Sequence, residues 1–204
     1  MKKYLLTAVA LLICVCMNAQ KIAVFPVEDY SAPAREGFME GESVNLIIFD
    51  ARSLPQKSKI ECSSEEVIES LSSIIMKAYP SANINVLPSS QYYKNAADSL
   101  ITIRIAINAY QAGFSNALNG TVGSIGGALS FGLSTDGKWH GVTGYNVIID
   151  DKRGGEPKRY TDSMSAEEAH SNTMGFTTAK KCLTASFMQA TDKMLVFIDS
   201  SLLQ

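Results

Sequence analysis

One stretch of the sequence limits the fold more than any other: in residues 100–110, every second side chain is apolar. One row is apolar throughout and the other is mixed, the two rows being Ile101, Ile103, Ile105, Ile107 and Ala109 against Thr102, Arg104, Ala106, Asn108 and Tyr110. Successive side chains of a strand point to opposite faces, so this pattern predicts a half-buried strand. The chain therefore needs a sheet with one face packed on a second layer.

Other segments supply further strands. Residues 142–149 repeat the same period of two, and Lys152–Gly155 is typical of a hairpin turn leading to a short polar strand at 158–162. Residues 44–49 are almost continuously apolar, which favours a strand buried on both faces. Shorter strands are expected at 84–87 and at 21–27, the latter interrupted by Pro26, and residues 28–43 are expected to be a loop.

Two amphipathic helices are predicted. Ser63 followed by Glu66 is a capping box, the apolar residues of 67–78 repeat at helical spacing, and Pro80 ends the helix. In the second helix, a stripe of apolar residues at helical spacing runs for five turns over residues 179–198. With both helices on one face of the sheet, the fold class is α/β (α+β): a two-layer sandwich whose mixed, mostly antiparallel sheet is covered by two helices. Phe187 and Ile105 are expected in its core.

The first residues predict export. Lys2 and Lys3 precede an apolar run from Tyr4 to Val15, too short for a permanent span, and Ala19 is a small residue before a cut. Residues 1–19 are thus predicted to be a signal peptide, and the junction Ala19-Gln20 resembles exported proteins of the Bacteroidetes. Lipidation at Cys14 or Cys16 is the alternative, although Ile13 and Val15 are bulky where a small residue is needed.

The mature chain is expected to be one envelope domain, residues 20–204, with a glycine-rich insertion at 112–137. Without Lys2 and Lys3 it has 16 basic residues against 20 acidic ones, a net charge of −4, and it has no basic block. This composition argues against nucleic acid as a partner.

Cys62 and Cys182 remain after the cut. In an oxidising compartment they could form one disulfide, and the alternative is two buried free thiols. The sequence does not show whether their Cα atoms come within bridging distance, and the pair of free thiols is slightly favoured.

The glycine-rich segment breaks the pattern. No charged residue occurs from Ile105 to Thr135, and residues 113–132 are rich in glycine and small side chains. A plain surface loop is one interpretation, a phosphate-binding loop is disfavoured by the glycine spacing, and contact with a membrane or partner chain is the third. We take as a hypothesis that the segment projects between strands 100–111 and 142–149 and binds a partner. Its candidate contact residues are Phe114, Leu118, Val122, Ile125, Leu129 and Phe131.

No arrangement typical of catalysis is found, so we expect no enzyme, no metal site and no cofactor. There is no Gly-x-Ser-x-Gly elbow. His170 follows Glu167 and Glu168, and it could share a helix face with Glu167, but a third metal ligand is not evident. These three residues are more typical of a solvated helix start. Trp139, before His140, is expected to anchor a sheet edge.

The order of elements and short patterns resembles the YajG-type and ABC-transport-auxiliary lipoproteins and the periplasmic domain of the curli-export (CsgG-like) lipoproteins. A strand ends in Asp50-Ala51-Arg52, a long strand opens with residues 97–101, and an amphipathic helix runs from Cys182-Leu183 to residues 195–198. In the curli-export group a glycine-rich stretch after the long strand builds a membrane hairpin, and residues 113–132 occupy the equivalent place. The poor lipidation site and the lack of a second such hairpin depart from that pattern, which argues against a complete pore.

The resemblance implies a non-catalytic exported envelope accessory protein that acts by binding. The expected location is the periplasm or the periplasmic face of the outer membrane, and the expected partner is an envelope protein or a membrane surface, with self-association as a further option. The alternative functions are a small-ligand or lipid-binding periplasmic module with a cleft between helix and sheet, and a hydrolase with an unrecognised site.

Overall fold

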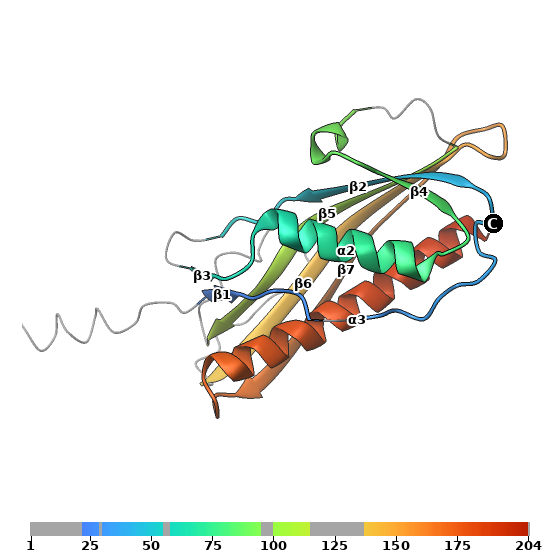
Figure 1. Ribbon diagram of the computed structural model, residues 1–204. Helices are drawn as coiled ribbons and strands as arrows, with labels where there is room; N and C mark the ends of the chain where they lie inside the picture. Colours follow the sequence, from blue (N-terminus) through green and yellow to red (C-terminus); the bar gives the residue numbers. More distant parts are fainter. Residues whose placement is uncertain (1–21, 29, 55–57, 95–99, 115–136, 204) are drawn as a thin grey trace, which may run out of the picture.

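The computed structural model describes residues 22–28, 30–54, 58–94, 100–114 and 137–203. In these ranges seven strands form one sheet, and α2 and α3 both cover the same face of it (Figure 1). The elements are β1 (Ile22–Val24), β2 (Ser43–Asp50), β3 (Lys59–Ile60), α2 (Ser64–Ala78), β4 (Asn83–Leu87), the 3₁₀ turn η1 (Ser89–Gln91), β5 (Ile101–Phe114), β6 (Lys138–Asp151), β7 (Lys158–Ser171) and α3 (Phe176–Leu202). The predicted fold class, a mixed sheet under a layer of two helices, is confirmed.

Strand β5 is the centre of the sheet because it pairs along both of its edges. On one edge β6 runs antiparallel to it along its whole length, and β7 pairs antiparallel with β6. On the other edge β2 lies parallel to residues 101–107, and β1 lies antiparallel to residues 112 and 113. Strand β4 pairs parallel with β2, and strand β3 pairs parallel with β1. Most of the antiparallel pairing therefore comes from the β5–β6–β7 meander, whose three strands have 14 residues each.

A bulge between Ile107 and Ala109 changes which side chains of β5 face the helices. Through Ile107 the odd-numbered residues belong to the main core, whereas beyond the bulge Tyr110 does, with its ring 5.5 Å from that of Phe187 on α3. The apolar row predicted from the sequence is therefore right through Ile107 and wrong at Ala109, which takes the other face. An extra residue in one strand of an antiparallel pair shifts the alternation by one.

Strand β7 departs most from the sequence prediction. A short polar strand at 158–162 was expected, but β7 continues to Ser171 and is paired with β6 throughout. Residues 167–170 are thus strand, not the solvated start of a helix, and α3 begins only at Phe176. Trp139 is buried in β6, between β5 and β7, and so does not lie at a sheet edge.

Helix α2 begins where the capping box predicted. The backbone N–H of Glu66 donates to Ser63 Oγ at 3.2 Å, and the N–H of Ser63 donates to the Glu66 carboxylate at 2.6 Å. The apolar stripe that includes Leu71 and Ile75 is buried over β2. Because Pro80 cannot continue the helix, α2 ends at Ala78 as expected.

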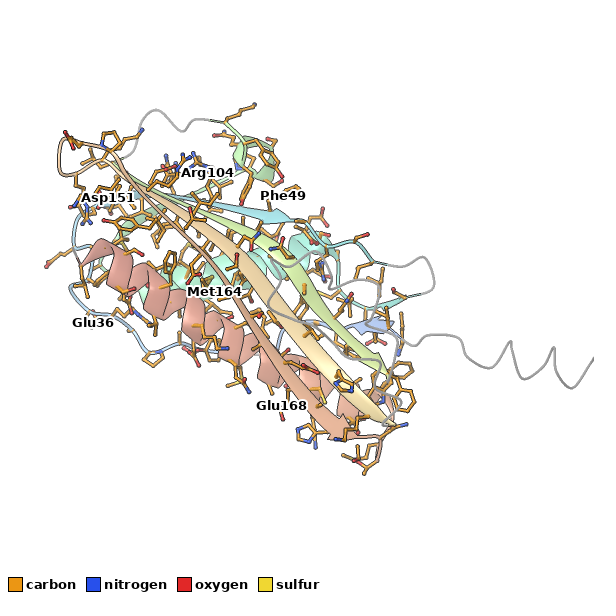
Figure 2. All side chains as sticks on the ribbon, turned by 180° about the vertical axis from the view of Figure 1, so that it is seen from behind. Glu36, Phe49, Arg104, Asp151, Met164 and Glu168 are labelled. Carbon is orange, nitrogen blue, oxygen red and sulfur yellow. The ribbon has the colours of Figure 1, made fainter. Side chains whose placement is uncertain are left out.

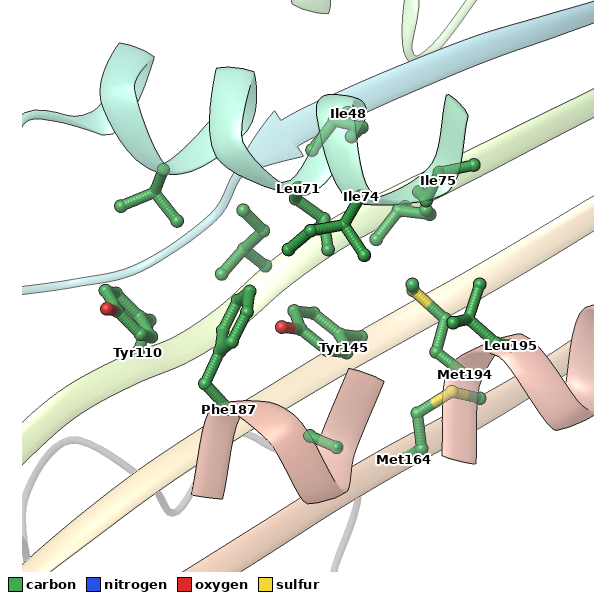
Figure 3. Packing of buried hydrophobic residues seen from close by; sticks show 14 of the residues in the cluster. Ile48, Leu71, Ile74, Ile75, Tyr110, Tyr145, Met164, Phe187, Met194 and Leu195 are labelled. Atoms are coloured by element: carbon green, nitrogen blue, oxygen red, sulfur yellow. The ribbon is translucent and has the colours of Figure 1, made fainter. Parts of the chain in front are cut away.

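The core lies between the two helices and the sheet. Figure 3 shows Phe187 of α3 between Tyr110 and Tyr145 of the sheet, while Leu71 descends from α2 to the same layer. Phe187 is 2% exposed and Ile105 is fully buried, which confirms the prediction that both are core residues.

The segment between β1 and β2 ties the two helices together; we call residues 25–28 and 30–42 the strap. The Tyr30 hydroxyl donates to Asp192 of α3, and Arg35 Nε donates to Asp199 of α3 at 2.6 Å. The backbone N–H of Arg35 donates to the carbonyl of Ala78, the last residue of α2, at 2.8 Å. These bonds fix the strap along the helical layer.

Candidate functional site

One end of the sheet brings together parts of the chain that are distant in sequence. Ile22 of β1 lies opposite Gly113 of β5, and Phe114 lies opposite Trp139 of β6. Strand β3 lies beside β1, and α3 begins at the same end (Figure 1). The chain leaves β5 and re-enters β6 here, so the insertion predicted from the sequence joins the fold at this end.

Aromatic rings are packed at this end around Trp139. Its ring centroid lies 5.4 Å from that of Phe114 and 5.5 Å from that of Phe176, and Phe176 in turn lies 6.2 Å from Phe25. The ammonium of Lys59 lies 4.4 Å from the centroid of the Phe176 ring, within the range of a cation–π contact. Four rings from the strap, β5, β6 and α3 thus form one continuous apolar unit.

This unit extends to the surface. Ile60 and Met174 are each 55% exposed, and Phe176 is 41% exposed. Phe176 packs on the buried ring of Trp139, and Met174 lies in the turn just before it, so these two exposed side chains are not scattered single residues. Ile60 is exposed at the same end, on the face of β3 opposite to Lys59. We call the exposed trio Ile60, Met174 and Phe176, with Phe25, Phe114 and Trp139 under it, the aromatic end.

The turn that presents Met174 and Phe176 is fixed by hydrogen bonds. Asn172 Oδ1 accepts from Trp139 Nε1 at 3.2 Å and from the backbone N–H of Gly175 at 3.0 Å. The N–H of Met174 donates to Thr178 Oγ1 at 3.1 Å. Gly175 has a φ of 60°, a left-handed value that suits glycine at the start of α3. The exposure of the two apolar side chains is therefore built into the turn.

Only one of the six contact residues predicted from the sequence lies within the described residues. Phe114 lies in the aromatic end, half-buried at the end of β5. The remaining five, Leu118, Val122, Ile125, Leu129 and Phe131, lie outside the described residues. Their role in binding stays a prediction.

The two histidines belong to opposite faces of the sheet near the aromatic end. His140 Nδ1 lies 2.7 Å from Glu167 Oε1 on the face away from the helices, and His170 Nε2 lies 3.0 Å from Glu168 Oε1 on the other. Over the described ranges, no three His, Cys, Asp or Glu side chains form a group that could hold a metal ion.

Cys62 and Cys182 are both buried free thiols and are not bridged. Cys62 Sγ donates to the carbonyl of Ser63 at 3.6 Å, and Cys182 Sγ donates to the carbonyl of Trp139 at 3.4 Å. Burial raises the pKa of both thiols, which keeps them protonated and unreactive. The disulfide considered from the sequence is therefore absent from the structure.

A cluster of paired arginines and aspartates lies at the other end of the long strands. Figure 2 shows Arg104 and Asp151 there, and Glu168 at the end described above. Asp150 accepts from Arg104 and from Arg159, the latter at 2.6 Å, so each of the two arginines has a carboxylate partner. This cluster closes the β6–β7 hairpin and has the character of a structural ion pair network.

A cavity of about 430 Å³ opens between the strap and α2. It is lined in part by Glu28, Tyr30, Glu69, Ser73 and Lys77. The exposed Glu69 and Lys77 make it a surface groove, unlike the mostly apolar, enclosed pockets typical of small-ligand sites. It also lies between strap and helix, not between helix and sheet as the ligand-binding alternative expected.

Sequence reasoning missed the aromatic end because its exposed residues have no periodic pattern. Met174 and Phe176 stand in a turn with Asn172 and Gly175, and Ile60 lies in a two-residue strand. Large apolar side chains in a glycine-containing turn are the signal that could have found it. The described helices include none that is both long and apolar enough to span a bilayer.

Comparison with known proteins gives a weak likeness of fold. No family model matches the chain, and no curated protein matches it. Among solved structures, the hypothetical protein CT253 from Chlamydia trachomatis has a TM-score of 0.49 at 7% identity, covering 78% of this chain and 96% of that one. Protein XCC0632 from Xanthomonas campestris, of family DUF330, has a TM-score of 0.43 at 7% identity, covering 90% and 94%.

Lipoprotein GNA1162 from Neisseria meningitidis is also similar, with a TM-score of 0.34 at 10% identity over 72% of this chain and 96% of that one. All three TM-scores lie below 0.5, so these likenesses assign neither a family nor a function.

Proposed function

We propose that this protein is a non-catalytic, exported component of the cell envelope that acts by binding an envelope protein or a membrane surface through the aromatic end. The observation that carries the proposal is the exposed pair Met174 and Phe176, which a hydrogen-bonded turn holds in place with Phe176 on the buried ring of Trp139, together with Ile60 exposed at the same end. An apolar surface that the fold keeps in place is typical of a contact surface.

The position of this surface supports the same function. The uncharged segment that the sequence analysis assigned to binding joins the fold at Phe114, which is itself part of the aromatic end. Leu100 is also exposed but is next to the charged β6–β7 turn, and Val196 is exposed towards the other end of α3. The uncharged segment thus joins the fold at the same end as the exposed Met174 and Phe176.

Export is part of the proposal, with cleavage after Ala19 and a final location in the periplasm or on the periplasmic face of the outer membrane. N-terminal sequencing of the protein from fractionated cells is expected to give a chain that begins at Gln20. Recovery of the uncut chain from the cytoplasm would overturn this part of the proposal.

Binding is tested by pull-down from envelope extracts with three forms of the protein. The test variant carries Ile60→Ser, Met174→Ser and Phe176→Ser. The control carries Leu100→Ser, Val196→Ser and Leu203→Ser, three residues that are 52%, 61% and 73% exposed. The parent and the control are expected to retain envelope partners or membrane, and the test variant to lose them. Equal retention by all three forms would show that the contact surface lies elsewhere.

A further inference from the structure

We propose that the aromatic end docks on the interfacial region of a lipid bilayer. This inference rests on the proposed function and names the partner of the same surface. It assigns to Ile60, Met174 and Phe176 the role of side chains that enter the headgroup and upper acyl region, while the sheet and helices stay in water.

The size of the surface favours lipid over a protein partner. A stable protein interface takes about 20–30 residues a side and roughly 800 Å² from each partner. The aromatic end offers three exposed large apolar side chains, and the adjoining β7 carries polar or charged residues such as Glu168 and His170. A bilayer needs no complementary shape, so a few apolar side chains at one end of the molecule give weak, reversible docking of the marginal kind that a single acyl chain gives.

The chemistry of the rim fits a membrane interface. Lys59 lays its ammonium over the Phe176 ring at 4.4 Å and pairs with Glu61 at 2.5 Å. A lysine side chain at a membrane interface keeps its ammonium at headgroup level while its stem lies along apolar surface. Because Glu61 pairs with Lys59, these two residues together add no net charge. Docking should therefore depend on apolar contact more than on anionic lipid.

The adjoining sequence does not oppose this placement. The chain continues from Phe114 with residues 115–135, none of which is charged. Charged side chains next to the docking surface would have to lose water on approach to the bilayer, at a large free-energy cost. Residues 115–135 contribute no charge of this kind.

The test is sedimentation with vesicles of phosphatidylcholine alone and of phosphatidylcholine with phosphatidylglycerol. The protein begins at Gln20, so that the apolar run of residues 4–15 cannot insert and every described residue is kept. The parent is expected to sediment with both kinds of vesicle, with little change on adding salt. The triple serine variant of the aromatic end is expected to show a partition coefficient lower by about tenfold or more, and the matched control variant none.

Each outcome decides the matter. Thermal melts of the three forms establish that all are folded, as expected for substitutions of exposed side chains. Failure of the folded parent to sediment overturns lipid docking, as does equal sedimentation of parent and triple variant. Binding that needs phosphatidylglycerol and disappears with salt would overturn the apolar mechanism. If vesicles fail but the pull-down still depends on the aromatic end, the partner is a protein and the proposed function stands.

Discussion

At Phe187, rings from three parts of the chain meet. Its centroid lies 5.5 Å from that of Tyr110 on β5 and 6.5 Å from that of Tyr30 in the strap, both edge-on. Truncating Phe187 to alanine leaves a cavity at this junction, so the free energy of unfolding is expected to fall by about 3–5 kcal/mol. Val196→Ala on the exposed side of the same helix should change it by less than about 0.5 kcal/mol. Urea unfolding measures both, and equal midpoints would show that the helix layer is wrongly assigned.

Gly141 sets how closely α3 approaches β6. A Cβ atom at this position would lie 2.2 Å from the carbonyl carbon of Cys182 and 2.3 Å from the backbone nitrogen of Leu183. Both obstacles are backbone, so Gly141→Ala must push the helix off the sheet, at an expected cost of about 1–3 kcal/mol. Gly154→Ala, where no heavy atom lies within 4 Å, is the matched control. Thermal melts that show the same stability for both variants would contradict the close approach.

Among the elements, the β5–β6 hairpin makes a specific prediction about the segment between its strands. Phe114 and Trp139 are register partners, so residues 116–136 and Gly137 can be replaced by the two-residue turn Asn-Gly between Ser115 and Lys138. The shortened protein is expected to fold, because the core between helices and sheet is untouched. Its circular dichroism spectrum and melting temperature test this. An unfolded product would mean that the segment is needed for the core.

The elements also show which parts of the fold could be predicted from the sequence. The start of α2 was predictable because Ser63 and Glu66 act locally, and β5 was predictable because its alternation is long. The bulge after Ile107 and the second half of β7 were not, since both depend on pairing with β6 and not on the strand's own sequence. Of the candidate site, Phe114 was predicted from the sequence. Ile60 and Met174 were not, because only the tertiary structure brings β3 and the turn before α3 to the same end of the sheet.

Across the whole molecule, buried carboxylates link stability to pH. Burial works to raise the pKa of Asp50, but hydrogen bonds from Arg52 and Ser64 outweigh it, and the pKa lies below its usual value. The pKa values of Asp150 and Asp151 are also lowered by arginine partners, against the effect of burial. A carboxyl whose folded-state pKa is lowered stabilises the fold fully above the unfolded value, near pH 4, and loses this contribution as the pH falls through the folded value.

Unfolding free energy is therefore expected to be level at neutral pH and to fall steeply below about pH 4. Asp50→Asn removes one such group and leaves Arg52, whose side chain is 3% exposed, without its carboxylate. This variant should be less stable at pH 7 by about 3 kcal/mol and should have a shallower acid limb. Denaturant titrations across the acid range measure both effects. An unchanged acid limb would exclude Asp50 as a source of the pH dependence.

The central claim for the molecule is that its contacts are made at the aromatic end. Photo-crosslinking in intact cells tests it most directly, with a benzophenone side chain placed at Ile60 or at Leu100, which are 55% and 52% exposed at the two ends of the sheet. The account predicts adducts with lipid or an envelope protein from position 60 and none from position 100. Adducts from position 100 alone would contradict it.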